Sequence, residues 1–188
     1  MSEFDPLHSY QQLCDKVDVF FDKVASKHAA SMQCASGCYD CCAAGLSVTL
    51  IEAASIAWYL AESKPELLKA LAESDVAADG SGFVALDAAG QCRIYTPRPL
   101  VCLSHGVPIR SREPDNGLPV FDTCFRNFQG EGELESVPEE DQLDQLNLST
   151  MLAAIDAAFV DTAGVPRGTR LDLAEFLADP FAVFGVDE

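Results

Sequence analysis

The stretch CASGCYDCC, residues Cys34 to Cys42, places four cysteines within nine residues, and the last two are adjacent. Thiolates are soft ligands that suit zinc and iron, and short spacings let one turn of backbone present several sulfurs to the same ion. Three and two residues separate Cys34, Cys38 and Cys41. This pattern predicts an irregular, cysteine-rich metal-binding centre around which the rest of the chain packs.

The adjacent pair Cys41 and Cys42 sets a condition on that centre. We expect consecutive side chains to point in different directions, so both thiols serve only if two metals or one larger cluster lie nearby, or if one thiol has a supporting or redox role. Cys92, Cys102 and Cys124 come from later in the chain, as remote ligands usually do. The seven thiols exceed the four that one tetrahedral site needs.

Length and composition favour metal binding over disulfide formation. The chain has 188 residues, enough to bury a hydrophobic core without disulfides. Its first residues, MSEFDPLHSY, lack the basic and apolar regions of a secretory signal, and no run of about 18 apolar residues occurs. We therefore expect a soluble, cytoplasmic protein. Disulfides are uncommon in that reducing compartment, where clustered cysteines more often bind metal or do redox chemistry.

The net charge of −18 argues against nucleic acid and anionic membranes as partners, because both are themselves negatively charged. The stretch from Cys92 to Arg126 is different, since it holds five arginines and three acidic residues. Four thiolates on one Zn²⁺ leave about two negative charges, which a positive segment would balance. Surface arginines of an irregular loop region are the alternative interpretation.

Apolar periodicity and capping signals predict a mainly α fold, with helices packed around the loop-rich cysteine centre. Residues 7–31 carry apolar side chains at spacings of three and four, which is typical of an amphipathic helix. Its buried side includes Cys14 and His28, and we interpret both as core residues rather than ligands. Two capping boxes, Thr49 with Glu52 and Ser63 with Glu66, predict two short helices after the cysteine-rich stretch.

The second half of the chain is more irregular. Residues 79–127 are rich in glycine and proline, with only short strand-like pieces such as GFVAL and QCRIY. Residues 130–144 contain seven acids and no cation, which predicts a solvated linker. Helices are expected over 141–162 and 169–178. The predicted domains are a cysteine-cluster metal-binding domain with its N-terminal helix over 1–128, an acidic linker over 129–144, and C-terminal helices over 145–188 that pack on the same domain.

Read together, CASGCYDCC, LSVTLIEAASIA, LDAAGQCRIYTPRPLVC and the late cysteine of DTCFRNF resemble the YkgJ-like cysteine-cluster family. The resemblance spans about residues 34–128. It implies a domain that chelates zinc or iron, and the metal could be bound as one ion, two ions or an iron-sulfur cluster. The implied metal ligands are Cys34, Cys38, Cys41, Cys42, Cys92, Cys102 and Cys124, and Tyr95, Arg98 and Pro99 match the family's IY-RP signature.

The chain departs from the family pattern at two positions. Many members have a further cysteine where this chain has Phe83, and an arginine where it has Leu103. The ligand set is therefore smaller than in those members. His105 stands three residues after Cys102 and could replace a lost ligand, or it could be a structural histidine.

Arg98 is predicted to support the metal ligands rather than to bind metal. Pro97 and Pro99 would hold the chain extended around it, so that its guanidinium could donate to a thiolate or to a nearby carbonyl. Tyr95 and His105 are assigned to the same supporting group. A plain surface arginine is the alternative interpretation.

These residues favour a metal-binding protein with a metal-handling, redox or structural role. A second hypothesis is a cluster-dependent enzyme that modifies proteins, because the cysteine-rich stretch loosely resembles that of flagellin lysine methylases. A third is an acidic adaptor whose zinc is structural and whose helices bind a basic protein partner. A structural site predicts that removing the metal unfolds the chain. The sequence does not decide between these roles, nor whether the chain is an enzyme.

Overall fold

The structure, a computed structural model, describes residues 4–35, 37–42, 45–73 and 85–184. They form two compact units that interleave along the sequence. The first unit draws on Met1–Tyr10, Ser36–Pro99 and Ile155–Glu188, and the second on Gln11–Ala35 and Leu100–Ala154. The domain boundaries given above, at residues 128 and 144, stay a prediction.

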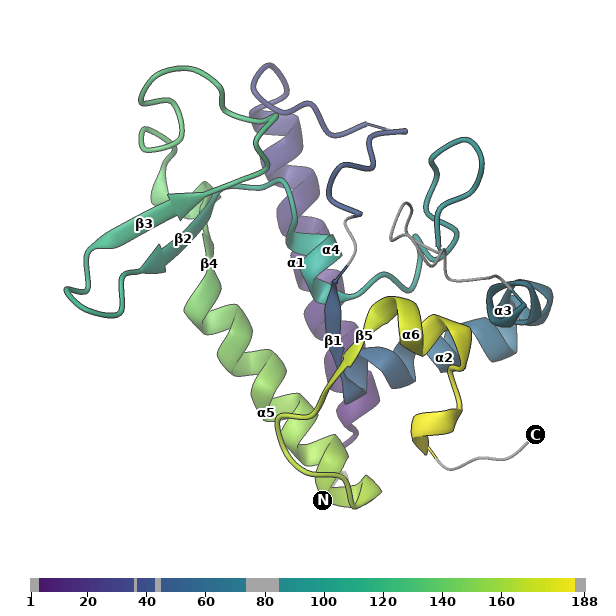
Figure 1. The fold of residues 1–188 in the computed structure, drawn as a ribbon. Coiled ribbons are helices and arrows are strands. Elements are labelled where there is room, and N and C mark those ends of the chain that lie inside the picture. Colours follow the sequence, from purple (N-terminus) through teal and green to yellow (C-terminus); the bar gives the residue numbers. More distant parts are fainter. Residues whose placement is uncertain (1–3, 36, 43–44, 74–84, 185–188) are drawn as a thin grey trace. The chain divides into compact units, whose positions relative to one another are not determined.

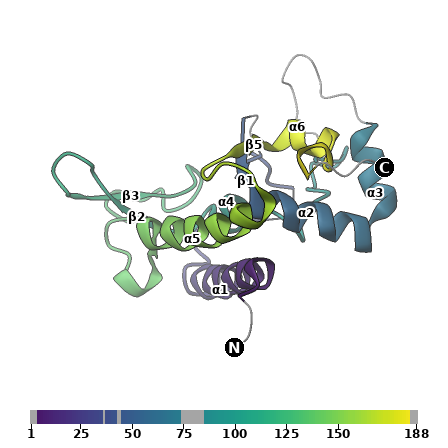
Figure 2. The same cartoon turned by 90° about the horizontal axis from the view of Figure 1, so that it is seen from below.

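The first unit combines three helices with a two-stranded antiparallel sheet (Figure 2). Its elements are β1 (Ser47–Thr49), α2 (Leu50–Ser63), α3 (Pro65–Ala72), β5 (Arg170–Asp172), α6 (Leu173–Ala178) and a 3₁₀ helix at Ala182–Phe184. Strands β1 and β5 pair with Ser47 opposite Asp172. The apolar core includes Ile56, Leu60 and Leu71, all fully buried. Because each such side chain stabilises the fold by about 1.5–3 kcal/mol, this core is a main source of the unit's stability.

Helix α2 begins at a capping box, as the sequence predicts. The Glu52 carboxylate accepts hydrogen bonds from the Thr49 N–H at 2.8 Å and from the Thr49 hydroxyl at 2.9 Å. The Ile51 N–H donates to the buried Asp156 carboxylate at 3.0 Å. Two carboxylates therefore satisfy N–H groups at a helix start, where the helix itself offers no acceptor.

Other predicted helix boundaries need correction. Ser63 is the last residue of α2, so Lys64 occupies the N-cap position of α3 and the second predicted capping box does not form. The N-terminal helix α1 (Pro6–Lys27) and the long helix α5 (Gln145–Ala163) are shorter than their predicted spans. The helix predicted over 169–178 starts only at Leu173, because the residues before it pair with β1 as strand β5.

The second unit contains most of α1, the first part of α5 and a three-stranded sheet (Figure 1). Its other elements are α4 (Leu100–Ser104), β2 (Ile109–Arg112), β3 (Pro119–Asp122), a 3₁₀ helix at Glu139–Asp141 and β4 (Leu143–Asp144). Strand β2 lies between β3, which is antiparallel to it, and β4, which is parallel. Val24, Val107, Phe128 and Val137 are buried together beside this sheet's strands and α1.

The fold class is mixed rather than mainly α. About 48% of the described residues are helical and 11% are in strands. The hairpin β2–β3 was not predicted, although Asp115, Asn116 and Gly117 provide its turn signal. Of the strand-like pieces, QCRIY contributes an isolated bridge between Cys92 and Leu86, whereas GFVAL lies mostly outside the described residues.

Within the described part of the chain, every helix is too short or too polar to cross a membrane.

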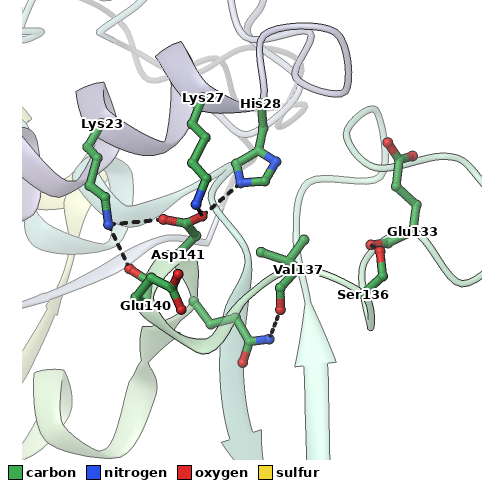
Figure 3. A network of polar contacts seen from close by, with 9 residues as sticks. Lys23, Lys27, His28, Glu133, Ser136, Val137, Glu140 and Asp141 are labelled. Carbon is green, nitrogen blue, oxygen red and sulfur yellow. Dashed lines mark hydrogen bonds and ion pairs between the residues drawn. The ribbon is translucent and has the colours of Figure 1, made fainter.

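An ion-pair network joins the end of α1 to the acidic segment in the second unit (Figure 3). The Asp141 side chain is completely buried and contacts Lys23 Nζ at 3.0 Å, Lys27 Nζ, and His28 Nε2 at 3.1 Å. Lys23 also donates to the Glu140 carbonyl at 3.0 Å. The expectation that residues 130–144 form a solvated linker is therefore wrong at Asp141, whose side chain is buried among Lys23, Lys27 and His28.

Burial acts to raise the pKa of Asp141, but hydrogen bonds from Lys27, Lys23 and His28 outweigh it and hold that pKa well below its usual range. An aspartate with a lowered folded-state pKa stabilises the protein above its unfolded pKa of about 3.9. This stabilisation is lost as the pH falls through the folded-state pKa. The network therefore contributes at neutral pH and weakens in acid.

We predict that Asp141→Asn lowers the free energy of unfolding by about 2 kcal/mol at pH 7, because it removes the carboxylate that Lys23, Lys27 and His28 share. The difference from wild type should shrink as the pH falls below about 4, where Asp141 takes up a proton in the unfolded chain while it stays ionised in the folded chain. Urea unfolding at a series of pH values measures both effects. Glu140→Gln, a change at an exposed neighbour, is the control, and an Asp141→Asn difference independent of pH would contradict the assignment.

Candidate metal centre

Three of the predicted ligands lie on one tight turn of the first unit. Cys38, Cys41 and Cys42 belong to the segment 37–42, and the Cys42 N–H donates to the Tyr39 carbonyl at 2.8 Å. Their side chains are half-buried. The turn presents three thiols from five consecutive residues, as the spacing predicts.

The fourth thiol is that of Cys92, which follows a second tight loop that packs against the cysteine turn. Asp87 Oδ1 accepts hydrogen bonds from the Ala89 N–H at 2.9 Å and the Gln91 N–H at 2.8 Å, which closes the loop directly before Cys92. Gly90 in this loop has a φ of +72°, and a Cβ there would lie 2.7 Å from Cδ1 of Tyr39. Only glycine leaves room for the Tyr39 ring, and this contact packs the loop against the cysteine turn.

The four thiols lie close enough to affect one another's ionisation. Burial, together with the neighbouring Cys42 and Cys38, raises the pKa of Cys41 to about 11. Burial and the charges of Cys92 and Cys38 likewise raise the pKa of Cys42, although a hydrogen bond from Cys41 opposes this. Although adjacent side chains are expected to point in different directions, the thiols of Cys41 and Cys42 lie close enough to shift each other's pKa.

Cys92 is the member of the set with a cationic neighbour. Burial raises its pKa, while the Ile94 N–H and the Arg98 charge act in the opposite direction. Cys42 and Cys92 also pack against the apolar core, so the thiols lie at the edge of that core. The thiolate forms of Cys41, Cys42 and Cys92 are therefore costly in the metal-free chain, and a bound cation would offset that cost.

Arg98 and Tyr95 form a pair beside Cys92. The Arg98 guanidinium lies over the Tyr95 ring, 4.0 Å from its centroid, and donates to the Tyr95 carbonyl at 3.0 Å. The Tyr95 side chain is largely exposed. These contacts hold the guanidinium near the thiols, in line with the supporting role predicted for both residues, which stays a prediction.

The donor set fits a soft ion, and its geometry is open. Four thiols match the ligand number and type of tetrahedral zinc or iron. In the part of the chain that the structure describes, however, His, Cys, Asp and Glu side chains are nowhere grouped in threes with spacing ready to hold an ion. The sulfur atoms would therefore have to move closer together to bind one metal ion.

The other three predicted ligands belong to the second unit. Cys34 follows the end of α1, Cys102 lies in α4, and Cys124 is buried just after β3. Gly106 has a φ of +102°, and a Cβ there would lie 2.7 Å from Cys34 Sγ. The Cys34 sulfur thus lies directly against the backbone that follows α4.

Asn127 is a site residue that the sequence analysis missed. Its side chain is 1% exposed, and its Nδ2 donates to Cys34 Sγ at 3.4 Å and to the Gly106 carbonyl at 2.7 Å. Its Oδ1 accepts from the Gln33 N–H at 2.8 Å. Asn127 stands three residues after Cys124 in DTCFRNF, so a polar residue close to the last cysteine is the signal that could have drawn attention to it.

The remaining residues singled out from the sequence belong to neither of the two groups of thiols. His105 is exposed in the turn after α4, and Leu103 is buried within α4, which explains an apolar residue there. Cys14 lies on α1 and is half-buried. Phe83 falls outside the described residues.

The arginine-rich stretch from Cys92 to Arg126 balances the charge of the thiols only in part. Arg98 acts on Cys92, but Arg110 instead pairs with Glu139 at 2.6 Å and Asp144 at 3.4 Å. Arg112 donates to the Gly117 carbonyl at 3.0 Å within the hairpin turn. Arg110 and Arg112 therefore stabilise the second unit's sheet.

We predict that Gly106→Ala lowers the free energy of unfolding by about 3 kcal/mol and displaces Cys34, because the new methyl group meets Sγ and the backbone is strained. Gly117→Ala is the matched control, since Gly117 also has a positive φ, of +70°, but open space around it. It should cost only about 1 kcal/mol. Denaturant unfolding of both variants measures the difference, and equal costs would show that Cys34 does not lie against Gly106.

Comparison with known proteins agrees with this cysteine arrangement. Residues 33–115 match the model of the CxxCxxCC family, which is described as a "putative zinc- or iron-chelating domain". The match covers the cysteine-rich turn, the loop before Cys92 and helix α4 with Cys102. Searches of curated proteins and of solved structures gave no match. Residues 33–115 of this chain are therefore similar to the CxxCxxCC family of zinc- or iron-chelating domains.

Proposed function

We propose that the chain binds a zinc or iron ion through Cys38, Cys41, Cys42 and Cys92 and exchanges it with other molecules. The observation that carries this proposal is the mutual electrostatic contact of these four thiols within one unit. Four thiolates complete a tetrahedral site without a contribution from elsewhere. The family description of zinc or iron chelation supports the same chemistry.

Two features favour an exchangeable ion over a purely structural one. The four thiols are half-buried, so a solvent-borne acceptor could reach a metal bound between them. The first unit has its own apolar core, to which only the edges of Cys42 and Cys92 contribute. A chain whose stability comes from that core does not need the ion to fold, unlike a small zinc finger.

We further propose that Cys34, Cys102 and Cys124 bind a second ion in the second unit. The seven predicted ligands are more than one tetrahedral site can hold. Four of these cysteines belong to the first unit and three to the second. A fourth position would be left for His105 or for water. The Asn127 side chain hydrogen-bonds to Gln33, Cys34 and Gly106, which supports placing Cys34 with the thiols of the second unit.

Substitution of single cysteines tests the assignment of the first site. We expect the reduced wild-type protein to bind two Zn²⁺ ions in an anaerobic titration, and Cys41→Ser to lose one of them, because it leaves only three thiols in the first unit. Cys14→Ser should still bind two, since Cys14 lies outside both sets. A Cys41→Ser variant with unchanged stoichiometry and affinity would exclude Cys41 as a ligand.

Metal removal separates exchange from a structural role. We expect protein treated with a chelator to keep its far-ultraviolet circular dichroism and to unfold cooperatively in urea. Restoring zinc at 100 times the Kd of a site should then raise the free energy of unfolding by about 2.7 kcal/mol for each site that is filled. An unfolded metal-free chain would instead favour the structural-zinc hypothesis.

A further inference from the structure

The buried Asn127 side chain connects the chain segments that carry the second unit's three thiols. Its Nδ2 donates to Cys34 Sγ itself, at 3.4 Å. The same Nδ2 donates to the carbonyl of Gly106, four residues after Cys102, at 2.7 Å. Its backbone N–H donates to the Cys124 carbonyl at 2.8 Å. One residue therefore bonds to the segments of all three cysteines.

The amide group has little freedom to point elsewhere. Asn127 is 1% exposed, and the Gln33 N–H, which donates to Oδ1 at 2.8 Å, fixes the position of the oxygen. With the oxygen fixed, Nδ2 must point toward Gly106 and Cys34 Sγ. A buried amide with every polar atom bonded is a rigid support.

The Gly106 carbonyl also accepts a hydrogen bond from the Thr123 hydroxyl at 2.9 Å. Thr123 therefore stabilises the same loop as Asn127. Its hydrogen bond supports the loop, whereas Asn127 bonds both the loop and the sulfur of Cys34. This pair of residues allows support of the loop to be separated from support of the thiol.

We propose that Asn127 is a positioning residue that orients the Cys34 sulfur for metal binding and donates a hydrogen bond to it in the metal-bound state. The inference rests on the proposed function, since it takes Cys34 as a ligand. N–H donors around metal-bound thiolates orient the ligand and tune the bond between metal and sulfur. Loss of such a donor typically weakens metal affinity 10- to 100-fold.

The test is a Co²⁺ titration of the reduced protein, followed through the sulfur-to-cobalt charge-transfer bands, on four chains. These are wild type, Cys34→Ser, Asn127→Asp and Thr123→Val. Asn127→Asp keeps the size and the acceptor of the side chain but replaces the donor to Sγ. The urea unfolding of each metal-free variant, measured in parallel, reports its structural cost.

We expect Asn127→Asp to raise the Kd for cobalt at the second site 10- to 100-fold and to change the charge-transfer bands that Cys34→Ser also alters. Thr123→Val should lower stability but leave cobalt Kd and spectrum as in wild type. If Asn127→Asp does not fold, Asn127→Ala, which removes the donor without adding a charge, takes its place with the same expectation.

The outcomes separate this proposal from the proposed function. Unchanged cobalt binding in Asn127→Asp, or an equal loss in Thr123→Val, overturns the positioning role while the metal sites stand. If Cys34→Ser binds cobalt as wild type does, Cys34 is not a ligand, and both the second site and the role of Asn127 fail. A wild-type protein that binds no cobalt overturns every proposal made for the thiols.

Discussion

The cost of ionising partly buried, neighbouring thiols is the physical constraint on which the cysteine centre depends. Burial raises the pKa values of Cys41, Cys42 and Cys92, and the charges of neighbouring thiols raise them further. Arg98 offsets only part of it, near Cys92. A divalent ion offsets much of this cost and uses the sulfurs as ligands. The same crowding that is unfavourable in the metal-free chain therefore favours chelation.

The rest of the first unit allows this crowding because its stability comes from elsewhere. Ile56 of α2, Leu71 of α3 and Leu177 of α6 are fully buried, whereas the thiols occupy the edge of that core. In the second unit, Asn127 and Gly106 provide a different solution, in which a hydrogen-bond donor and a missing side chain make room for a single sulfur. The two arrangements suggest that the two sets of thiols differ in rigidity.

The local features of the fold were predictable where one short segment determines them. The capping box of Thr49 and Glu52 fixes the start of α2, and the spacing of Cys38 and Cys41 fixes a thiol-rich turn, because all the interacting groups are a few residues apart. Features that depend on distant segments were not predictable. Strand β5 forms because β1 offers its edge more than a hundred residues away, and Asp141 is buried because α1 supplies its cations.

Asn127 illustrates the same limit within the candidate site. Its nearness to Cys124 is the one signal in the sequence, whereas its role arises from hydrogen bonds to Gln33, Cys34 and Gly106. The contact between Tyr39 and Gly90 is similar, since it joins the cysteine turn to the loop before Cys92 only in three dimensions. The sequence thus identifies which residue types can bind metal, and the tertiary structure determines which of them act together.

The central claim is that the clustered thiols hold metal, and the most direct test is the metal content of the protein purified without oxygen. Elemental analysis with an optical spectrum should give stoichiometric zinc with no colour, or iron with absorbance near 400 nm, and with sulfide in the case of a cluster. In both cases the thiols should be protected from alkylation until a chelator is added. Protein that contains no metal, with its thiols freely reactive or paired in disulfides, would contradict the account.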